Sequence, residues 1–254
     1  METVRKPFQG VRNIVRFNWH FYAFGFIVLV VLAYYYFSVE EHLRFLLLVF
    51  AVLFFLPVLI SLLVSYYVYD ASGFYSLKWL QIPNTSEKFK ILNINAGFDE
   101  TSFLLQQKFR NSEIKMLDFY DEKKHTEISI KRARTIYPNS LETISVTTDS
   151  LPFEDHSIDY IFLIFAAHEI RNDAERIVFF KELNRVLKQN GKVIITEHLR
   201  DFPNFLAFNI GFFHFLPMKI WRETFENSQF KISKKIKINP FVTTFYLSGN
   251  GTSS

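Results

Sequence analysis

Histidine and carboxylate side chains follow two apolar runs of this sequence and are its best candidates for acid–base chemistry. His168 and Glu169 come shortly after one run, and Glu197 and His198 close the other. Parallel strands would bring these ends to the same edge of a sheet, where such folds bind ligands. Histidine titrates near neutral pH and can take a proton from an acceptor group. The sequence therefore assigns His168, Glu169 and His198 to catalysis.

Each of these side chains also has a structural interpretation. His168 could be a packed histidine that hydrogen-bonds a carbonyl group, and Glu169 could be a helix-start charge stabilised by the helix dipole. Glu197 and His198 could instead hold Arg200 in an ion pair. Histidines and carboxylates together also suit an oxygen–nitrogen metal site. Because no ligand spacing requires such a site, the sequence assigns no metal.

A polar turn with the sequence NINAGFD, residues 93–99, ends a predicted strand. Glycine in such a turn permits unusual dihedral angles and the close approach of a ligand to the backbone. Asp118 follows Gly97 by 21 residues. An acidic residue about 20 positions after the turn can accept both ribose hydroxyls of a nucleoside cofactor, and Phe119 would lie against its adenine. The cofactor-binding residues predicted here are Asn93, Asn95, Gly97, Asp118 and Phe119.

A longer stretch carries the most specific pattern. Residues 147–161 read TTDSLPFEDHSIDYI, followed by FAAHEI at 165–170 and FKELNRVLKQNG at 180–191. In order and spacing these segments and the polar turn resemble class I S-adenosylmethionine-dependent methyltransferases, in the branch of the ubiquinone and menaquinone methyltransferases. Several matches in register are more specific than one motif. The resemblance covers roughly residues 88–200.

The resemblance implies a Rossmann-like sheet that binds S-adenosyl-L-methionine as methyl donor. It also implies that Thr148, Asp149 and Phe165 join the cofactor site. The sequence departs from the family at several positions. Asn93 replaces the usual acid of the first strand, Thr147 stands where an acidic residue near the adenine amine is usual, and one of three loop glycines is present. These departures weaken the predicted cofactor site.

Short apolar runs alternate with amphipathic stretches after about residue 86, which predicts a parallel sheet with helices on both faces. The Asn239–Pro240 turn joins the last two strands into an antiparallel hairpin. The predicted fold is therefore α/β, a seven-stranded methyltransferase sheet with an antiparallel C-terminal hairpin, preceded by two transmembrane helices. The predicted strands are 89–95, 113–118, 143–147, 158–164, 192–197, 229–238 and 241–247, and the predicted helices are 100–110, 121–135, 173–188 and 217–227.

Two long uncharged runs, 17–37 and 45–69, precede this domain. Each is long enough to cross a hydrocarbon core about 30 Å thick, and aromatic residues flank both. Basic residues before the first run place the N-terminus and the catalytic domain in the cytoplasm. The predicted organisation is a basic N-terminus (1–16), two transmembrane helices (17–69), a linker (70–87) and a methyltransferase-like domain (88–254).

The composition of the 254 residues excludes several classes of protein. The chain is 49% hydrophobic with 31 Phe and no Cys, which excludes disorder, a disulfide scaffold, thiolate catalysis and cysteine-based metal sites. A net charge of +4 is no nucleic-acid signature, but it suits anionic lipid heads. The membrane bilayer and a hydrophobic small molecule are the expected partners, and the oligomeric state is left open.

The aromatic segment 202–216 is either a packed helix or a lid that covers an apolar substrate and touches the bilayer. With the hairpin, it favours a membrane-anchored methyltransferase that acts on a hydrophobic or lipid-like acceptor such as a quinone precursor. The alternative is a catalytically inactive methyltransferase-fold module for binding or assembly, because the glycine loop is eroded. An NAD-dependent enzyme fits less well, because a pyrophosphate loop would need those glycines.

Overall fold

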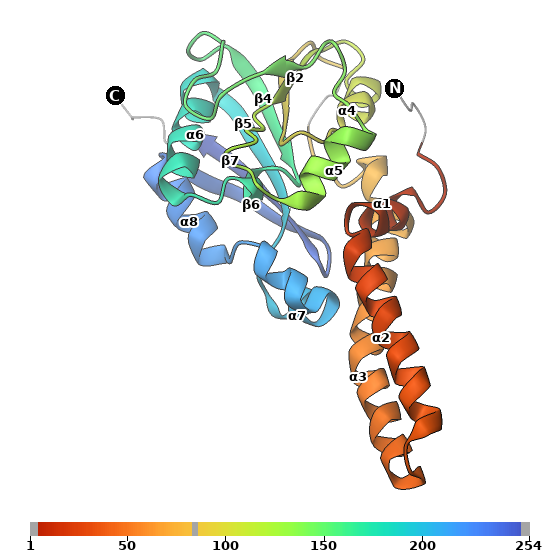
Figure 1. The fold of residues 1–254 in the computed structure, drawn as a ribbon. Coiled ribbons are helices and arrows are strands. Elements are labelled where there is room, and N and C mark those ends of the chain that lie inside the picture. Colours follow the sequence, from red (N-terminus) through yellow and green to blue (C-terminus); the bar gives the residue numbers. More distant parts are fainter. Residues whose placement is uncertain (1–4, 83–85, 250–254) are drawn as a thin grey trace.

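A helical hairpin joined to an α/β domain makes up the computed structural model, which describes residues 5–82 and 86–249 (Figure 1). Helices α2 (Trp19–Ser38) and α3 (Glu41–Tyr66) form the hairpin, and α3 continues into a π-helical turn, η1 (Tyr67–Ala71). Both helices are long and apolar enough to cross a membrane, a test of length and composition that core helices of soluble proteins also pass. Their most apolar stretches are not buried inside the structure.

A further helix, α1 (Gln9–Phe17), occupies part of the segment expected to be only a basic N-terminus. Nine residues are too few for a stable isolated helix, so the sequence pattern did not predict it. Its stability comes from η1, where the Asp70 carboxylate accepts the N–H groups of Gly10 at 2.8 Å and Val11 at 2.9 Å. Gly10 is needed there, since a Cβ atom would collide with Tyr69.

Seven strands form one mixed sheet in the order β3-β2-β1-β4-β5-β7-β6. Neighbouring strands are parallel from β3 to β5, and β7 is antiparallel to both β5 and β6. The predicted sheet with its C-terminal hairpin is therefore confirmed. The strands are β1 (Lys90–Asn95), β2 (Glu113–Asp118), β3 (Ile144–Ser145), β4 (Ile158–Ile164), β5 (Leu187–His198), β6 (Phe230–Asn239) and β7 (Val242–Gly249).

Helices cover both faces of the sheet, which explains why a central strand such as β1 is buried along most of its length. Helices α6 (Asp173–Val186) and α8 (Met218–Asn227) pack on one face through Phe179, Phe180 and Trp221. Helix α4 (Ser102–Lys108) covers the other face. The remaining helices are α5 (Ile128–Ile136), α7 (Phe202–Phe208) and the short 3-10 turns η2 (Phe74–Ser76), η3 (Ala167–Glu169) and η4 (Asn209–His214).

The segment predicted to be a linker packs on the domain instead. Phe74, Leu77 and Leu80 are almost fully buried, and Leu77 and Leu80 join the cluster beneath α4. The hairpin is held against the domain because this segment is an integral part of the core.

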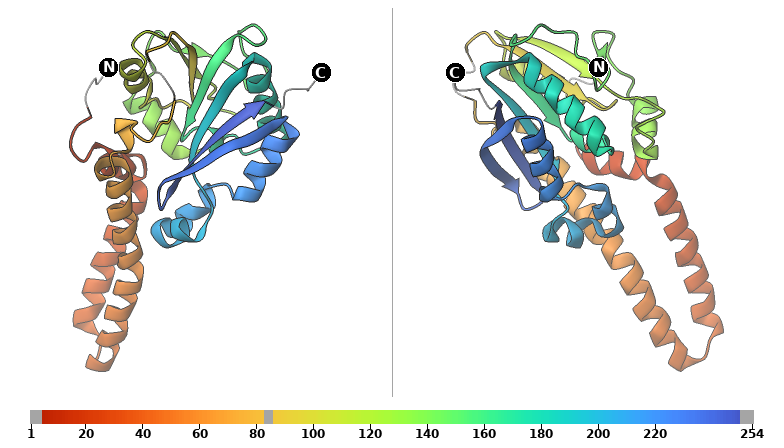
Figure 2. Two further views of the ribbon diagram at one scale, coloured as in Figure 1. Left: turned by 180° about the vertical axis from the view of Figure 1, so that it is seen from behind. Right: turned by 90° about the vertical axis from the view of Figure 1, so that its left-hand side faces the viewer.

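Helix α7 lies beside the end of the hairpin nearest the domain, as both views of Figure 2 show. The Asn209 side chain, which follows α7, donates to the carbonyl oxygen of Pro57 in α3 at 3.3 Å. The free tip of the hairpin lies far from the sheet (Figure 1). The N-terminal helix α1 and the α/β domain therefore lie at the same end of the hairpin.

Candidate functional site

The turn after β1 has the backbone conformation that a ligand-binding glycine turn requires. Gly97 has a φ of +94°, in the region that L side chains rarely adopt. The Asn95 side chain fixes the turn, because its Oδ1 accepts the Gly97 N–H at 2.8 Å. The Asn95 Nδ2 atom is buried and has no hydrogen-bond partner among the described residues. A ligand with an acceptor atom would satisfy it.

Asn93 has a structural role in this turn. Its amide is buried and donates to the hydroxyl groups of Thr101 at 3.1 Å and Ser102 at 2.8 Å. Asp99 accepts the N–H groups of the same two residues, each at 2.9 Å, at the start of α4. The side chain expected to contact a cofactor is thus committed to holding the helix that follows.

Asp118 ends β2 beside this turn, as the spacing predicted. Its side chain is only 5% exposed and accepts the Asn139 amide at 2.6 Å and the Tyr120 N–H at 2.9 Å. Arg134 of α5 donates to the same carboxylate. The Arg134 side chain also covers Gly97, because a Cβ atom there would lie 2.5–3.0 Å from three of its atoms. Sequence reasoning missed Arg134, since nothing in α5 marks it as near the turn.

The other predicted cofactor residues lie in two kinds of environment. Phe119 is buried and packs against Phe179 with ring centroids 5.3 Å apart, and the buried hydroxyl of Thr148 donates to Glu175 at 2.6 Å. Asp149 is exposed. Phe165 stacks on His198 with centroids 4.9 Å apart, on the side of the sheet edge nearest η1. The structure thus brings Asn95, Gly97 and Asp118 together and sets Phe165 apart from them.

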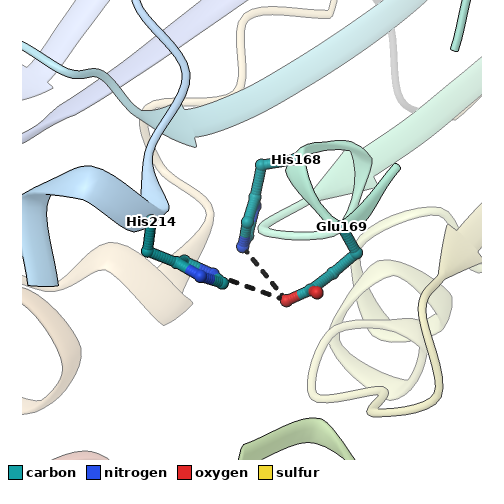
Figure 3. Close-up of side chains that lie close together, drawn as sticks. All are labelled: His168, Glu169 and His214. Carbon is teal, nitrogen blue, oxygen red and sulfur yellow. Dashed lines mark ion pairs between the residues drawn. The ribbon is translucent and has the colours of Figure 1, made fainter. Parts of the chain in front are cut away.

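A second group of side chains, which we call the histidine–carboxylate cluster, consists of His168, Glu169, Glu197 and His214 (Figure 3). His168 and Glu169 belong to η3, directly after β4, and Glu197 belongs to β5. His168 Nδ1 lies 2.6 Å from Glu197, and its Nε2 lies 3.3 Å from Glu169 Oε1. His214 Nε2 lies 3.5 Å from the same Glu169 oxygen. The predicted pair of His168 and Glu169 therefore meets in space.

The charges of the cluster shift the pKa values of its members. Burial by itself lowers the pKa of His168, but the carboxylates of Glu197 and Glu169 outweigh burial and raise it to about 10. Burial by itself raises the pKa of Glu169, but His168 and His214 hold it well below its usual range. With no other ligand bound, His168 is therefore an imidazolium at neutral pH and has no free site for a proton.

Two outer residues complete the surroundings of His214. Glu127 lies 3.3 Å from His214 Nδ1 and 3.6 Å from Arg171. The Arg171 guanidinium also donates to the His214 ring and to its carbonyl oxygen. His214 was not assigned to the site from sequence because it lies in the aromatic segment 202–216, and only the path of η4 brings it to the cluster.

His198 lies outside the cluster, in contrast to its predicted catalytic role. Its ring is sandwiched between Phe165 and Phe215, and burial lowers its pKa to about 3. Its Nδ1 lies 3.0 Å from the Phe241 carbonyl oxygen, so Nε2 accepts the Tyr69 hydroxyl at 2.8 Å. Both ring nitrogens are occupied, which makes His198 a structural link between η1 and β5.

Two more features lie near these groups. His125 is buried against Phe119, and its Nε2 has no hydrogen-bond partner among the described residues. A cavity of about 410 Å³ lies where the hairpin meets the domain, lined by residues such as Arg5, Tyr69 and Phe74. This cavity is separate from the cluster, because neither histidine of the cluster lines it.

Comparison with known proteins finds matches to the α/β domain. A family described as "Methyltransferase domain" matches residues 93–195, which include the glycine turn, Asp118 and two residues of the cluster, His168 and Glu169. This part of the chain is therefore similar to methyltransferase domains. The predictions of a methyltransferase and of S-adenosylmethionine as methyl donor are confirmed at the level of this family.

The methyltransferase domain has relatives of known function and of known structure. It is 30% identical over 137 residues to the demethylmenaquinone methyltransferase of Bacillus velezensis, covering 54% of this chain and 56% of the relative. The corresponding enzyme of Thermotoga maritima is 33% identical over 132 residues, 52% of each chain. The chain thus spans about half the length of these relatives. A methyltransferase structure from Aquifex aeolicus matches with a TM-score of 0.50 at 16% identity, covering 75% of this chain and 97% of that one, which supports the fold.

The methyltransferase domain fits the cofactor in its residues. The positive φ at Gly97 lets a ligand approach the backbone. The Asn95 Nδ2 atom, which has no partner among the described residues, can donate a hydrogen bond to the cofactor, and the Asp118 carboxylate at the end of β2 can accept one. Arg134 currently pairs with that carboxylate, and its side chain must move before ribose hydroxyls can bind there.

Proposed function

We propose that this chain is a membrane-anchored methyltransferase that transfers a methyl group from S-adenosylmethionine to a hydrophobic acceptor with an acidic hydroxyl group, such as a hydroquinone. The observation that carries the proposal is the docking of the hairpin against the catalytic edge of the sheet. The Tyr69 hydroxyl of η1 hydrogen-bonds His198 at the end of β5, next to Glu197 of the cluster.

Exposed aromatic side chains support membrane contact beside the site. In α7 and η4 the side chains of Phe205, Ile210 and Phe213 are exposed, Ile210 by 85%. Their segment is joined to α3 at Pro57, within the stretch that we propose to lie in the bilayer. A contiguous apolar surface beside a membrane helix is stable when it rests in the interface. A lipid-soluble acceptor would then reach the cluster without crossing water.

The proposed orientation follows from the hairpin. Both of its ends lie at the domain, so the N-terminus and the domain share one side of the membrane. Basic residues precede α2, which favours the cytoplasmic side for both. The two demethylmenaquinone methyltransferase relatives support an isoprenoid quinol as one acceptor of the right chemistry.

Each group of residues has a role in this proposal. Gly97, Asn95 and Asp118 would hold the cofactor, which supplies an electrophilic methyl group on a sulfonium. The cluster would bind the hydroxyl group of the acceptor, because the Glu169 Oε2 atom is buried and has no hydrogen-bond partner among the described residues. An oriented acceptor in a water-poor site gains rate from proximity alone. His198 and Phe165 would support the wall between the site and η1.

The experiment uses the full chain in liposomes with S-adenosylmethionine labelled in its methyl group. Demethylmenaquinol in the bilayer is the acceptor, and a short-chain water-soluble hydroquinone is the comparison. The expected result is label in the extracted lipid, with slower transfer to the soluble compound. Label found only in aqueous products would exclude a lipid-soluble acceptor.

The inactive binding module remains a second candidate because Arg134 already neutralises Asp118. It predicts no binding of S-adenosylmethionine or S-adenosylhomocysteine to the folded chain. Calorimetric binding of either compound, followed by label transfer, would exclude this candidate.

A further inference from the structure

The histidine–carboxylate cluster has a feature that proton transfer does not require. Two imidazole Nε2 atoms, from His168 and His214, converge on one oxygen of Glu169 (Figure 3). The ligating atoms of the three residues all lie within 4.8 Å of one another. We propose that His168, Glu169 and His214 bind one Zn²⁺ ion, with a fourth coordination position open to the acceptor.

The two distances from Glu169 to the imidazole nitrogens agree with a tetrahedral ion, and the two imidazoles, whose ligating atoms lie within 4.8 Å of each other, would close around it. Zinc lies about 2.0–2.2 Å from imidazole nitrogen and carboxylate oxygen, so tetrahedral ligand atoms are about 3.4 Å apart. The Glu169 oxygen lies 3.3 Å from His168 Nε2 and 3.5 Å from His214 Nε2. Two histidines with one glutamate are also a ligand set of catalytic zinc sites, which keep the fourth position open.

The outer residues orient both ligands. Histidines that bind metal usually donate their other ring N–H to a carboxylate or carbonyl group. Here His168 Nδ1 faces Glu197 at 2.6 Å, and His214 Nδ1 faces Glu127 at 3.3 Å. Both Nε2 atoms are thereby turned toward Glu169.

The charge of the site also suits a divalent cation. With both imidazoles neutral, the carboxylates of Glu127, Glu169 and Glu197 face one guanidinium, that of Arg171, which leaves a formal charge of −2. Both imidazoles approach Oε1 of Glu169, so an ion bound there leaves the buried Oε2 atom, which has no hydrogen-bond partner among the described residues, for the acceptor hydroxyl group. Arg171 Nη2 lies against His214 Nδ1 and 3.2 Å from His214 Nε2, so this guanidinium must move away from the ring before the ion binds and before Nδ1 can donate to Glu127.

The role of the ion rests on the proposed function, whereas its binding does not. At its open coordination position, the Zn²⁺ ion would bind the acceptor hydroxyl oxygen and lower the pKa of that hydroxyl group. The hydroxyl proton would pass to water, and the resulting oxyanion would stay on the ion. The acceptor class is therefore a phenol or hydroquinone with a free hydroxyl group.

The test measures metal in the full chain, purified in detergent, with any affinity tag removed. After incubation with Zn²⁺ and desalting, we expect about one zinc per chain by mass spectrometry. Replacement by Co²⁺ should give the intense visible bands of a tetrahedral nitrogen–oxygen site. His214→Asn and Glu169→Gln should lose the ion, and Glu197→Gln should bind it 10–100-fold more weakly. His42→Asn removes an exposed histidine beside a glutamate at the far hairpin tip and should retain it.

Two results would overturn the zinc site. One is substoichiometric zinc in a folded wild-type chain without cobalt bands. The other is equal zinc retention in wild type, His214→Asn and Glu169→Gln. The cobalt spectrum of the wild-type chain decides the matter even if a variant fails to fold. Methyl transfer by a zinc-free chain would refute the role of the ion and leave the proposed function intact. Zinc binding without methyl transfer would overturn the proposed function and leave the zinc site intact.

Discussion

We expect Arg134 to oppose cofactor binding, so the Arg134→Ala substitution should strengthen that binding. The guanidinium pairs with Asp118 and covers Gly97, so ribose hydroxyls and Arg134 compete for one carboxylate. Asp118 keeps two other hydrogen bonds, from Asn139 and the Tyr120 N–H, when Arg134 is absent. The carboxylate would therefore stay ionised and correctly placed in Arg134→Ala.

The size of the effect follows from the exposure of the pair. A hydrogen bond between charged groups contributes about 1.5–3 kcal/mol when it is protected from water. The Arg134 side chain is 34% exposed, so screening reduces this to about 1 kcal/mol. If cofactor binding breaks the ion pair between Arg134 and Asp118, the Arg134→Ala substitution lowers the Kd of the cofactor by about fivefold.

The assay is calorimetric titration of S-adenosylhomocysteine and S-adenosylmethionine into the detergent-purified chain. Lys131→Ala is the matched control, because it removes a cation from α5 that pairs with Glu122 and does not contact Asp118. Arg134→Ala should bind both compounds more tightly than wild type, and Lys131→Ala should not. An unchanged or weakened affinity in Arg134→Ala would show that the guanidinium does not compete with the cofactor.

Three further predictions concern the turn, the hairpin contact and the aromatic segment. Gly97→Ala should lower cofactor affinity at least tenfold in the same calorimetry. The φ of +94° at this position is strained for alanine, and the new Cβ atom would collide with Arg134. An affinity equal to that of the wild type would contradict this prediction. Tyr69→Phe should lower the stability by about 1 kcal/mol and Tm by about 2–4 °C, since it removes a buried hydrogen bond to His198; an unchanged melting curve would speak against it. Because the chain has no Cys, a fluorescent dye can be attached to a single introduced cysteine. A dye on Phe213→Cys should be quenched by spin-labelled lipids, whereas a dye on Asp155→Cys, in the turn before β4, should not be. Equal quenching of the two dyes would exclude contact of the aromatic segment with the bilayer.

The sheet was predictable because strand burial leaves a strong mark on sequence. Strands β2 and β4 have the predicted bounds, and half or more of the residues in each strand are buried. Helix α5 was placed too early, at residue 121, because the segment 121–127 is polar but forms a turn around Asp121 and His125. Local pattern cannot separate a helix from such a turn.

The candidate site was predictable in part, and for a related reason. Residues that end strands, such as Asp118, Glu197 and the pair His168–Glu169, are located by the strands themselves, because parallel strands share one carboxyl edge. His198 also ends a strand, but its side chain points to η1 and packs between aromatic rings. The direction of a side chain at the last strand residue depends on what packs there.

The amino-acid order specifies the strands, the glycine turn and the apolar helices, because each of these depends on hydrophobic periodicity or on one residue's conformational freedom. Contacts between distant segments specify the rest. Arg134 meets Asp118, His214 meets Glu169, and Asp70 stabilises α1 across gaps of 16, 45 and about 60 residues. Side-chain pairing over such distances depends on how the chain packs in three dimensions, and nothing in the local sequence records it.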